Sequence, residues 1–113
     1  MIGTSFIDST LVDVVFHSSL IRYGNFSNCK FQHISLAKTD CSQASFHYLD
    51  VKDLVISESC LDSAEFLETS LNQVDLSDSS ISGIVTDLKS LKGVKVSFEQ
   101  AASLAQILGI TIV

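Results

Sequence analysis

Apolar residues recur at every fifth position through most of this 113-residue chain. We call sixteen of these positions, which run without exception from residue 6 to residue 81, the centres of the repeat. They are Phe6, Leu11, Phe16, Ile21, Phe26, Phe31, Leu36, Cys41, Phe46, Val51, Ile56, Leu61, Phe66, Leu71, Leu76 and Ile81. An amphipathic helix has a period of about 3.6 and a strand a period of about 2, so neither pattern fits. The spacing instead predicts an array of five-residue repeats.

The residues two positions before the centres form a second set, which runs from Thr4 to Ser79. None of them is charged and most are small, as expected for side chains that point inward at a tight corner. The chain has sixteen charged residues up to Asp87, and none of them lies on a centre or in the second set. Because burying an unpaired charge is costly, this distribution predicts two inward and three outward positions in each repeat.

Two of the units, AEFLE at 64–68 and VDLSD at 74–78, resemble the A(D/N)LXX repeat of the pentapeptide-repeat family. The resemblance covers roughly residues 2–86. It implies an all-β solenoid, a right-handed quadrilateral β-helix with four pentapeptides in each turn. Residues twenty apart in sequence are then expected to stack on one another.

The phenylalanines agree with that expectation. Phe6, Phe26, Phe46 and Phe66 are spaced by twenty residues, while Phe16 and Phe31 are the other two phenylalanines among the centres. Rings stacked at about the interstrand spacing of ~4.8 Å would pack well along one wall of a solenoid. The sequence therefore predicts about four coils over residues 1–86, with these phenylalanines in the core.

After Ile81 the five-residue register weakens, which predicts a C-terminal cap over residues 87–113. Ser97 is a suitable helix N-cap with Gln100 three residues later, and Gly109 is a suitable stop. These signals predict a helix at about 97–108, followed by a terminal strand. The helix and the strand carry more apolar residues than one coil end can cover, which predicts a homodimer about a two-fold axis. The residues expected in that interface are Leu104, Ile107, Leu108, Ile110 and Ile112.

The cap, residues 83–113, resembles the C-terminal end of the quinolone-resistance pentapeptide proteins through LKGVKV at 91–96, Gln100, Leu104 and LGITI at 108–112. This resemblance implies a homodimer joined through the C-terminal helix. It also implies a rod that mimics duplex DNA and binds the type II topoisomerases DNA gyrase and topoisomerase IV. Those proteins carry loops that project from the coils, whereas no insertion breaks the five-residue register of this chain.

Charge is distributed unevenly along the array. The net charge is −6, and residues 53–88 contain eight acidic residues but no Lys, Arg or His. These residues, predicted to form an acidic partner-binding face, are Asp53, Glu58, Asp62, Glu65, Glu68, Asp75, Asp78 and Asp87. Such a surface would repel nucleic acid and steer the chain toward a basic groove, although an ordinary solubility surface also explains it.

The sequence offers little for catalysis, metal binding or cofactor binding. Three cysteines, an odd number without a C-x-x-C motif, argue against a disulfide framework and a zinc site. His17, His33 and His47 fall on outward positions and have no Asp or Ser partner at a fixed short spacing. Carboxylates such as Asp62 and Glu65 would lie on a convex wall without the pocket that acid–base chemistry requires. We therefore expect a protein without enzymatic activity.

The N-terminal end has neither a basic leader nor a long apolar run, which predicts a cytoplasmic protein without a membrane span. The register already begins at Thr4 and Phe6, so the first coil is expected to expose apolar side chains and strand edges. Three functions stay open: a DNA mimic acting on topoisomerases, an interaction scaffold for another protein, and the C-terminal half of a longer rod.

Overall fold

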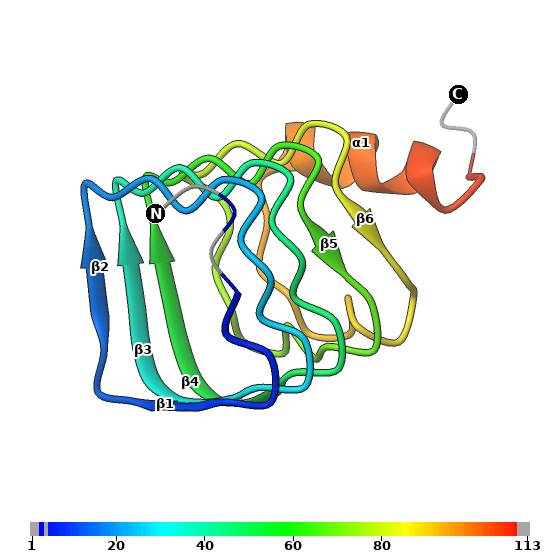
Figure 1. Cartoon of the computed structure of the whole chain (residues 1–113). Coiled ribbons are helices and arrows are strands. Elements are labelled where there is room, and N and C mark those ends of the chain that lie inside the picture. Colours follow the sequence, from blue (N-terminus) through cyan, green and yellow to red (C-terminus); the bar gives the residue numbers. More distant parts are fainter. Residues whose placement is uncertain (1–2, 4, 111–113) are drawn as a thin grey trace.

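The structure is a computed structural model that describes residue 3 and residues 5–110. It is a β-solenoid of about four coils with one C-terminal helix, as predicted (Figure 1). Viewed from the N-terminal end, the chain runs along the bottom, up the left side, across the top and down the right side while it recedes from the viewer. The solenoid is therefore right-handed and has four sides.

Every strand pair is parallel and has the same register. The elements are β1 (Thr10–Val12), β2 (Val15–His17), β3 (Lys30–Ala37), β4 (Asp50–Ser57), β5 (Glu65–Phe66), β6 (Val85–Thr86) and α1 (Phe98–Ile107). Leu11 pairs with Phe31, and Phe31 pairs with Val51, so partners lie twenty residues apart. The same spacing joins Phe66 to Thr86 at the other end of the array. This register confirms four pentapeptides in each coil.

The phenylalanine column is continuous through the core. The rings of Phe6, Phe26, Phe46 and Phe66 are nearly parallel, with centroid distances of 5.2, 5.2 and 4.8 Å between neighbours. Phe31 packs edge-on against Phe26 at 5.8 Å and against Phe46 at 6.4 Å. Both arrangements are favourable for aromatic rings. From Ile21 to Ile81, every centre except Val51 is buried.

The corners of the coil are formed by residues two positions after the centres. Fourteen of these residues have positive φ although they are not glycine, among them Tyr23, Lys38 and Tyr48. A left-handed residue redirects the backbone between successive sides, at a cost for residues with a Cβ atom. Their side chains are exposed, so the corner positions accept residues of very different size and charge.

Buried hydroxyl groups complete the backbone hydrogen bonding at one inward column. The Thr39 N–H donates to Ser59 Oγ at 3.2 Å, and the Ser59 N–H donates to Ser79 Oγ at 3.1 Å. Thr39 Oγ1 donates in turn to the Phe16 carbonyl at 3.0 Å. Buried polar groups are stable only when they are paired, so these hydroxyls explain why Ser and Thr occupy inward positions.

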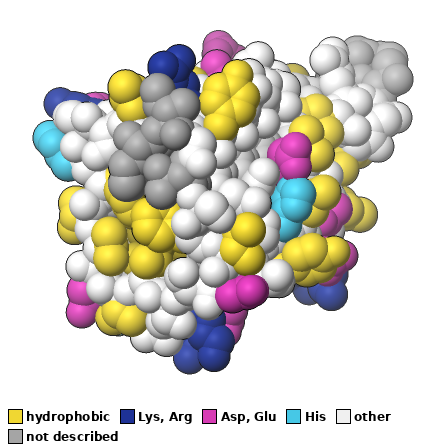
Figure 2. All heavy atoms as spheres, viewed as in Figure 1, with side chains coloured by type: hydrophobic (Ala, Val, Ile, Leu, Met, Phe, Trp, Pro, Cys, Tyr) yellow, Lys and Arg dark blue, Asp and Glu magenta, His cyan; other side chains and the backbone are white. Residues whose placement is uncertain are grey.

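The first coil is open toward the N-terminus among the described residues. β1 and β2 pair only with β3, and the centres Leu11 and Phe16 are half-buried. Its outward positions include Ile7, Val12, Val15 and Leu20, which are 48 to 67% exposed and belong to four successive pentapeptides. Hydrophobic side chains accordingly gather on the end that faces the viewer in Figure 2.

The twenty-residue pairing continues beyond residue 86, the predicted end of the array. Asp75 pairs with Lys95, and both Ile84 and Ser90 are 2% exposed. Leu91 and Val96 still fall on the five-residue register and pack against the core. The weakening seen in the sequence is therefore a change of residue type, because the coil itself continues to the start of the helix.

The cap is anchored by side-chain hydrogen bonds at the start of α1. Ser97 Oγ accepts the Gln100 N–H at 3.2 Å, and Gln100 Oε1 accepts the Ser97 N–H at 2.9 Å. The same Gln100 side chain donates to the carbonyls of Leu76 and Ser79, at 2.6 and 2.7 Å. This capping box fixes both the helix start and its position on the last coil.

Residues 111–113, and with them Ile112 and the predicted terminal strand, lie outside the described residues. In the part of the chain that is described, no helix is long and apolar enough to cross a membrane.

The stacked column gives the first prediction. Phe46→Ala should lower the free energy of unfolding by about 3 to 5 kcal/mol, because Phe46 lies between Phe26 and Phe66 and a cavity would replace its ring. The control change Tyr48→Ala removes a ring that is 61% exposed at a corner of the coil and should cost at most about 0.5 kcal/mol. Chemical denaturation of both variants measures the difference, and equal losses would contradict the assignment of inward positions.

Candidate interaction surfaces

The eight acidic residues surround the rod instead of lining one face. By the twenty-residue register, Glu58 and Asp78 share a column, and each of the other six lies in a column of its own. All eight side chains are exposed or half-buried. We call the set the acidic band; it consists of Asp53, Glu58, Asp62, Glu65, Glu68, Asp75, Asp78 and Asp87. The predicted single face is wrong because the chain passes all four sides within each twenty residues.

Two members of the acidic band contact histidines of the preceding coil. His33 Nδ1 lies 2.9 Å from Asp53 Oδ2, and His47 Nε2 lies 2.7 Å from Glu65 Oε1. The second contact lacks hydrogen-bond alignment, so it is an electrostatic contact. These partners lie 20 and 18 residues away in the sequence, so no fixed short spacing indicates them. Only the coil register brings them together.

Three other carboxylates support turns. Asp87 accepts the N–H groups of Glu68 at 2.9 Å and Ser90 at 2.7 Å. These bonds, the one from Glu68 first, lower the pKa of Asp87 below its ordinary value. Hydrogen bonds from the Ser77 side chain and its backbone N–H likewise lower the pKa of Asp75. Asp62 accepts the Ser82 N–H at 2.9 Å, so it too has a structural role.

The remaining carboxylates are the ones most available to a partner. The side chains of Glu58 and Glu68 make no hydrogen bond or ion pair with any described residue, and both are exposed. Asp78 is also exposed, and its oxygens accept only weak hydrogen bonds from Ser57 at 3.3 Å and Ser79 at 3.5 Å. These three carboxylates lie at corners of the coil, where they project from the rod.

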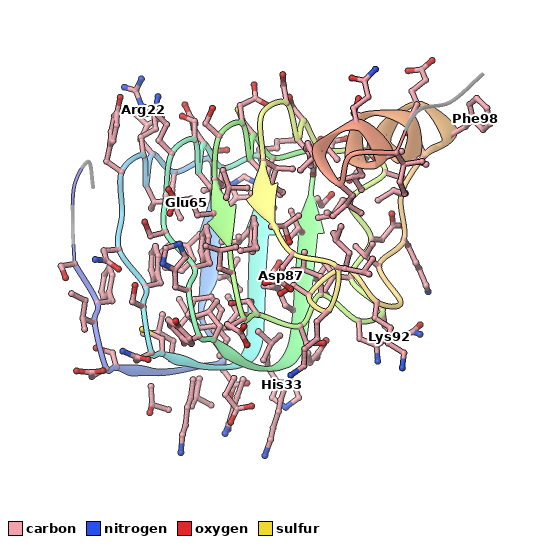
Figure 3. All side chains as sticks on the ribbon, turned by 90° about the vertical axis from the view of Figure 1, so that its right-hand side faces the viewer. Arg22, His33, Glu65, Asp87, Lys92 and Phe98 are labelled. Atoms are coloured by element: carbon pink, nitrogen blue, oxygen red, sulfur yellow. The ribbon has the colours of Figure 1, made fainter. Side chains whose placement is uncertain are left out.

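Basic residues interrupt the acidic band on one side. Lys30 and Lys52 lie on the side formed by β1 and the first halves of β3 and β4. Lys92 projects from the same side, at the lower right of Figure 3, where His33 is also labelled. Glu65 and Asp87 lie on the neighbouring side, which faces the viewer. The cross-section therefore carries one cationic side among predominantly acidic ones.

The helix presents a smaller apolar surface than predicted. Leu104, expected in a dimer interface, is only 6% exposed and belongs to the core, because it closes the end of the last coil. Leu108 is half-buried, whereas Ile107 and Ile110 are 41% and 54% exposed. Phe98, which projects from the end of the molecule in Figure 3, was not among the predicted interface residues. Phe98 is a large apolar residue in the first turn of the predicted helix, and this position could have identified it as a candidate interface residue.

The cysteines are poorly suited to reactivity. Burial raises the pKa of Cys41 to about 12, and desolvation also raises the pKa values of Cys29 and Cys60. Because the thiolate is the reactive form, these thiols are largely protonated and inert at neutral pH. The described residues contain no group of three or more His, Cys, Asp or Glu side chains that could hold a metal ion.

The second prediction concerns Asp87 and pH. Its pKa is lowered in the folded chain, so its contribution to stability is present above the unfolded value of about 4 and is lost as pH falls through the folded value. Asp87→Ala should lower the thermal midpoint at pH 7, and this difference should shrink below about pH 4. Glu68→Gln, which removes a neighbouring charge without a hydrogen bond, is the control. A constant difference across the pH range would contradict the role of the ionised carboxylate.

Comparisons with known proteins agree with the repeat. Residues 25–62 match the family described as pentapeptide repeats, with 8 copies of the unit. No curated protein sequence matches the chain significantly.

Among solved structures, the chain is similar to the pentapeptide repeat protein Rfr23 from the cyanobacterium Cyanothece 51142. The identity is 14%, the TM-score is 0.44, and the match covers 82% of this chain and 91% of Rfr23. It is also similar to trypsin-treated QnrB1, a plasmid-mediated fluoroquinolone resistance protein, at 13% identity and a TM-score of 0.41, over 99% of both chains. Full-length QnrB1 gives 20% identity and a TM-score of 0.29, over 96% of this chain and 80% of QnrB1. The matched repeats lie within the coils whose twenty-residue register is observed, so residues 25–62 of the chain are pentapeptide repeats.

Proposed function

We propose that this protein is a protein-binding rod whose acidic band enters a basic groove that otherwise holds nucleic acid. The observation that carries the proposal is the charge of residues 53–88, where eight carboxylates occur without any Lys, Arg or His. The likeness of the cap sequence to quinolone-resistance proteins makes DNA gyrase and topoisomerase IV the first partners to test. Such partners are cytoplasmic, so the proposal places the chain in the cytoplasm as well.

The density of charge supports mimicry of duplex DNA. Each coil adds about 4.8 Å, so the acidic band extends over two coils, or ~10 Å. Duplex DNA carries one charge per ~1.7 Å, which gives about six charges over the same length. Two of the eight carboxylates, those of Asp53 and Glu65, contact histidines, so six carboxylates of the acidic band have no cationic neighbour of this kind. A basic groove would therefore meet a similar number of negative charges on either molecule.

The same charges determine what the rod should avoid and how its binding should depend on salt. Negative potential repels nucleic acid, so the proposal excludes direct DNA binding by the acidic band. It also steers the rod toward a positively charged surface, and added salt should weaken that association. A scaffold for a different basic partner is the alternative, because the acidic band alone does not specify gyrase.

The third prediction tests where the charge is needed. Changing Glu58, Glu68 and Asp78 together to Lys should abolish inhibition or protection of gyrase in a supercoiling assay with and without a fluoroquinolone. Changing Asp8, Asp13 and Asp50 to Lys is the matched control. Each reversal adds two positive charges, so either triple variant moves the net charge from −6 to zero. The control should keep activity, because its residues lie outside the acidic band.

Equal loss in both triple variants would show that net charge alone matters and would contradict a localised interface. A wild-type protein without any effect on gyrase or topoisomerase IV would remove these partners and leave the scaffold. Circular dichroism of both variants separates loss of binding from loss of fold.

We also propose that two copies associate through the C-terminal helix. Phe98, Ile107 and Ile110 carry this proposal, because they leave apolar surface exposed beside the helix after Leu104 has been buried. Exposed apolar surface of this kind is favourable to cover in a self-complementary contact. A dimer of this geometry would place one acidic band on each side of the symmetry axis.

The fourth prediction follows from those residues. Sedimentation of the wild-type chain at tens of micromolar should show a dimer, and the double variant Phe98→Asp with Ile107→Asp should be a folded monomer. Val15→Asp changes a residue that is 67% exposed on the first coil and should leave the dimer intact. A monomeric wild-type chain, or a dimer lost only in the Val15 variant, would contradict the helix interface.

A further inference from the structure

Successive coils are joined by parallel backbone hydrogen bonds, which we call the ladder. It is interrupted on two of the four sides between the third coil, which contains β4, and the fourth coil. No backbone hydrogen bond joins residues 50–58 to residues 70–77, although the structure describes all of them. The equivalent N–H groups elsewhere are paired: Asp13 with Gln32, Ser18 with Ala37 and Lys38 with Ser57, at 2.9 to 3.0 Å. The N–H groups of Asp53, on the far edge of β4, and of Glu58, which directly follows β4, lack that partner. We call this interruption the seam.

The fourth coil forms turns beside the seam, whereas β4 is extended. The Asn72 N–H donates to Ser70 Oγ at 3.3 Å, and the Ser77 N–H donates to Asp75 Oδ1 at 2.9 Å. Side chains of this kind favour turns. β4, which contains Val51, Val55 and Ile56, is extended over eight residues, so its edge faces a segment of different backbone geometry.

The seam is hollow. A depression of about 260 Å³ is lined by Val51, Asp53 and Leu54 on one coil and by Ser70, Asn72, Gln73 and Val74 on the next. A second depression of about 470 Å³ shares Ser70 and Asn72 and extends to Lys89 and Lys92. Val51 is half-buried, although every other centre after the first coil is buried. The missing bonds and the exposure of Val51 therefore describe the same opening.

Both ends of the seam are closed. The Leu49 N–H donates to Thr69 Oγ1 at 3.2 Å, and Ser57 Oγ donates to Asp78 Oδ2 at 3.3 Å. The fourth and fifth coils are joined again, since the Leu71 N–H donates to the Ser90 carbonyl at 2.9 Å and the Lys95 N–H to Val74 at 2.8 Å. The seam is thus a bounded slot in an otherwise continuous solenoid.

The charges beside the slot favour an acidic occupant. Lys52 lies on β4, and Lys89 and Lys92 line the larger depression; all three side chains are exposed. Of the nearby carboxylates, Asp53 is held 2.9 Å from His33, and Glu68 lies at the rim. A bound carboxylate would therefore meet more positive than negative charge at the lysine end of the slot.

We propose that the seam binds a short extended peptide that carries an acidic side chain. Its backbone would pair with the free edge of β4, as in other cases of strand addition to an exposed edge. An apolar side chain would cover Val51 and Leu54, and a carboxylate would reach Lys89 and Lys92. This site shares Asp53 and Glu68 with the acidic band but differs from it in chemistry, because it recognises a negative group and not a basic groove.

The fifth prediction is tested with a fluorescein-labelled, capped hexapeptide that alternates Glu and Val. Fluorescence anisotropy should show saturable binding to the full chain, and a Lys–Val peptide of the same length should not bind. The double variant Lys89→Glu with Lys92→Glu should weaken binding by at least about tenfold, because it reverses both charges at the slot. Lys30→Glu with Lys38→Glu, an equal change of charge away from the seam, should have little effect.

Hydrogen exchange provides the structural readout. The amides of Asp53 and Glu58 should exchange rapidly in the free protein and become protected when the Glu–Val peptide is added, while the amide of Lys38 stays protected throughout. Protection of all three in the free, dilute chain would show that the seam is closed and overturn the proposal. Equal binding of the two peptides, or no binding at millimolar peptide, would also overturn the proposal. Protection that rises with protein concentration alone would overturn it as well, because it would assign the slot to a second copy of the chain.

Discussion

The whole structure depends on a parallel backbone ladder in which each residue pairs with the one twenty positions later. This spacing requires the two inward residues of every pentapeptide to stack on identical positions of the next coil. Apolar centres satisfy it by forming columns, of which the phenylalanine column at 4.8 to 5.2 Å is the most regular. Small residues or hydroxyls fill the other inward position, where Thr39 and Ser59 also accept or donate backbone hydrogen bonds.

The ladder also determines the surface. Because side chains one coil apart are neighbours, ion pairs form at spacings near twenty, as between His33 and Asp53. Carboxylates that follow one another in the sequence are instead carried to different sides, which converts an acidic stretch into the acidic band. Within it, Asp62, Asp75 and Asp87 accept backbone N–H groups, whereas Glu58 and Glu68 remain available. On a solenoid, each charged residue must therefore be assigned to its side of the coil before a set of such residues can be interpreted as a binding surface.

The ladder of paired coils stops at three places in the described part of the chain. At the first coil the described residues leave β1 and β2 with one partner strand, and apolar side chains surround that end. At the last coil α1 covers the core through Leu104 and Gln100 but leaves Phe98 exposed. Between the third and fourth coils, the extended β4 faces turns, and the seam lies between them. These three places differ in chemistry, since the first coil and the helix expose apolar side chains whereas the seam exposes backbone N–H groups.

The sequence by itself determined the repeat, the inward positions and the helix cap, because each depends on residues within one pentapeptide or one helical turn. The phenylalanine column was also visible there, because its members recur at a constant spacing of twenty residues. Tertiary structure decided the rest. Leu104 belongs to the core since the helix turns it toward the last coil, and the pairing reaches Lys95 since Leu91 and Val96 keep the register. The distribution of carboxylates and the seam depend on which residues lie one coil apart and on backbone geometry there. A linear sequence does not display those contacts, because they form only when successive coils stack.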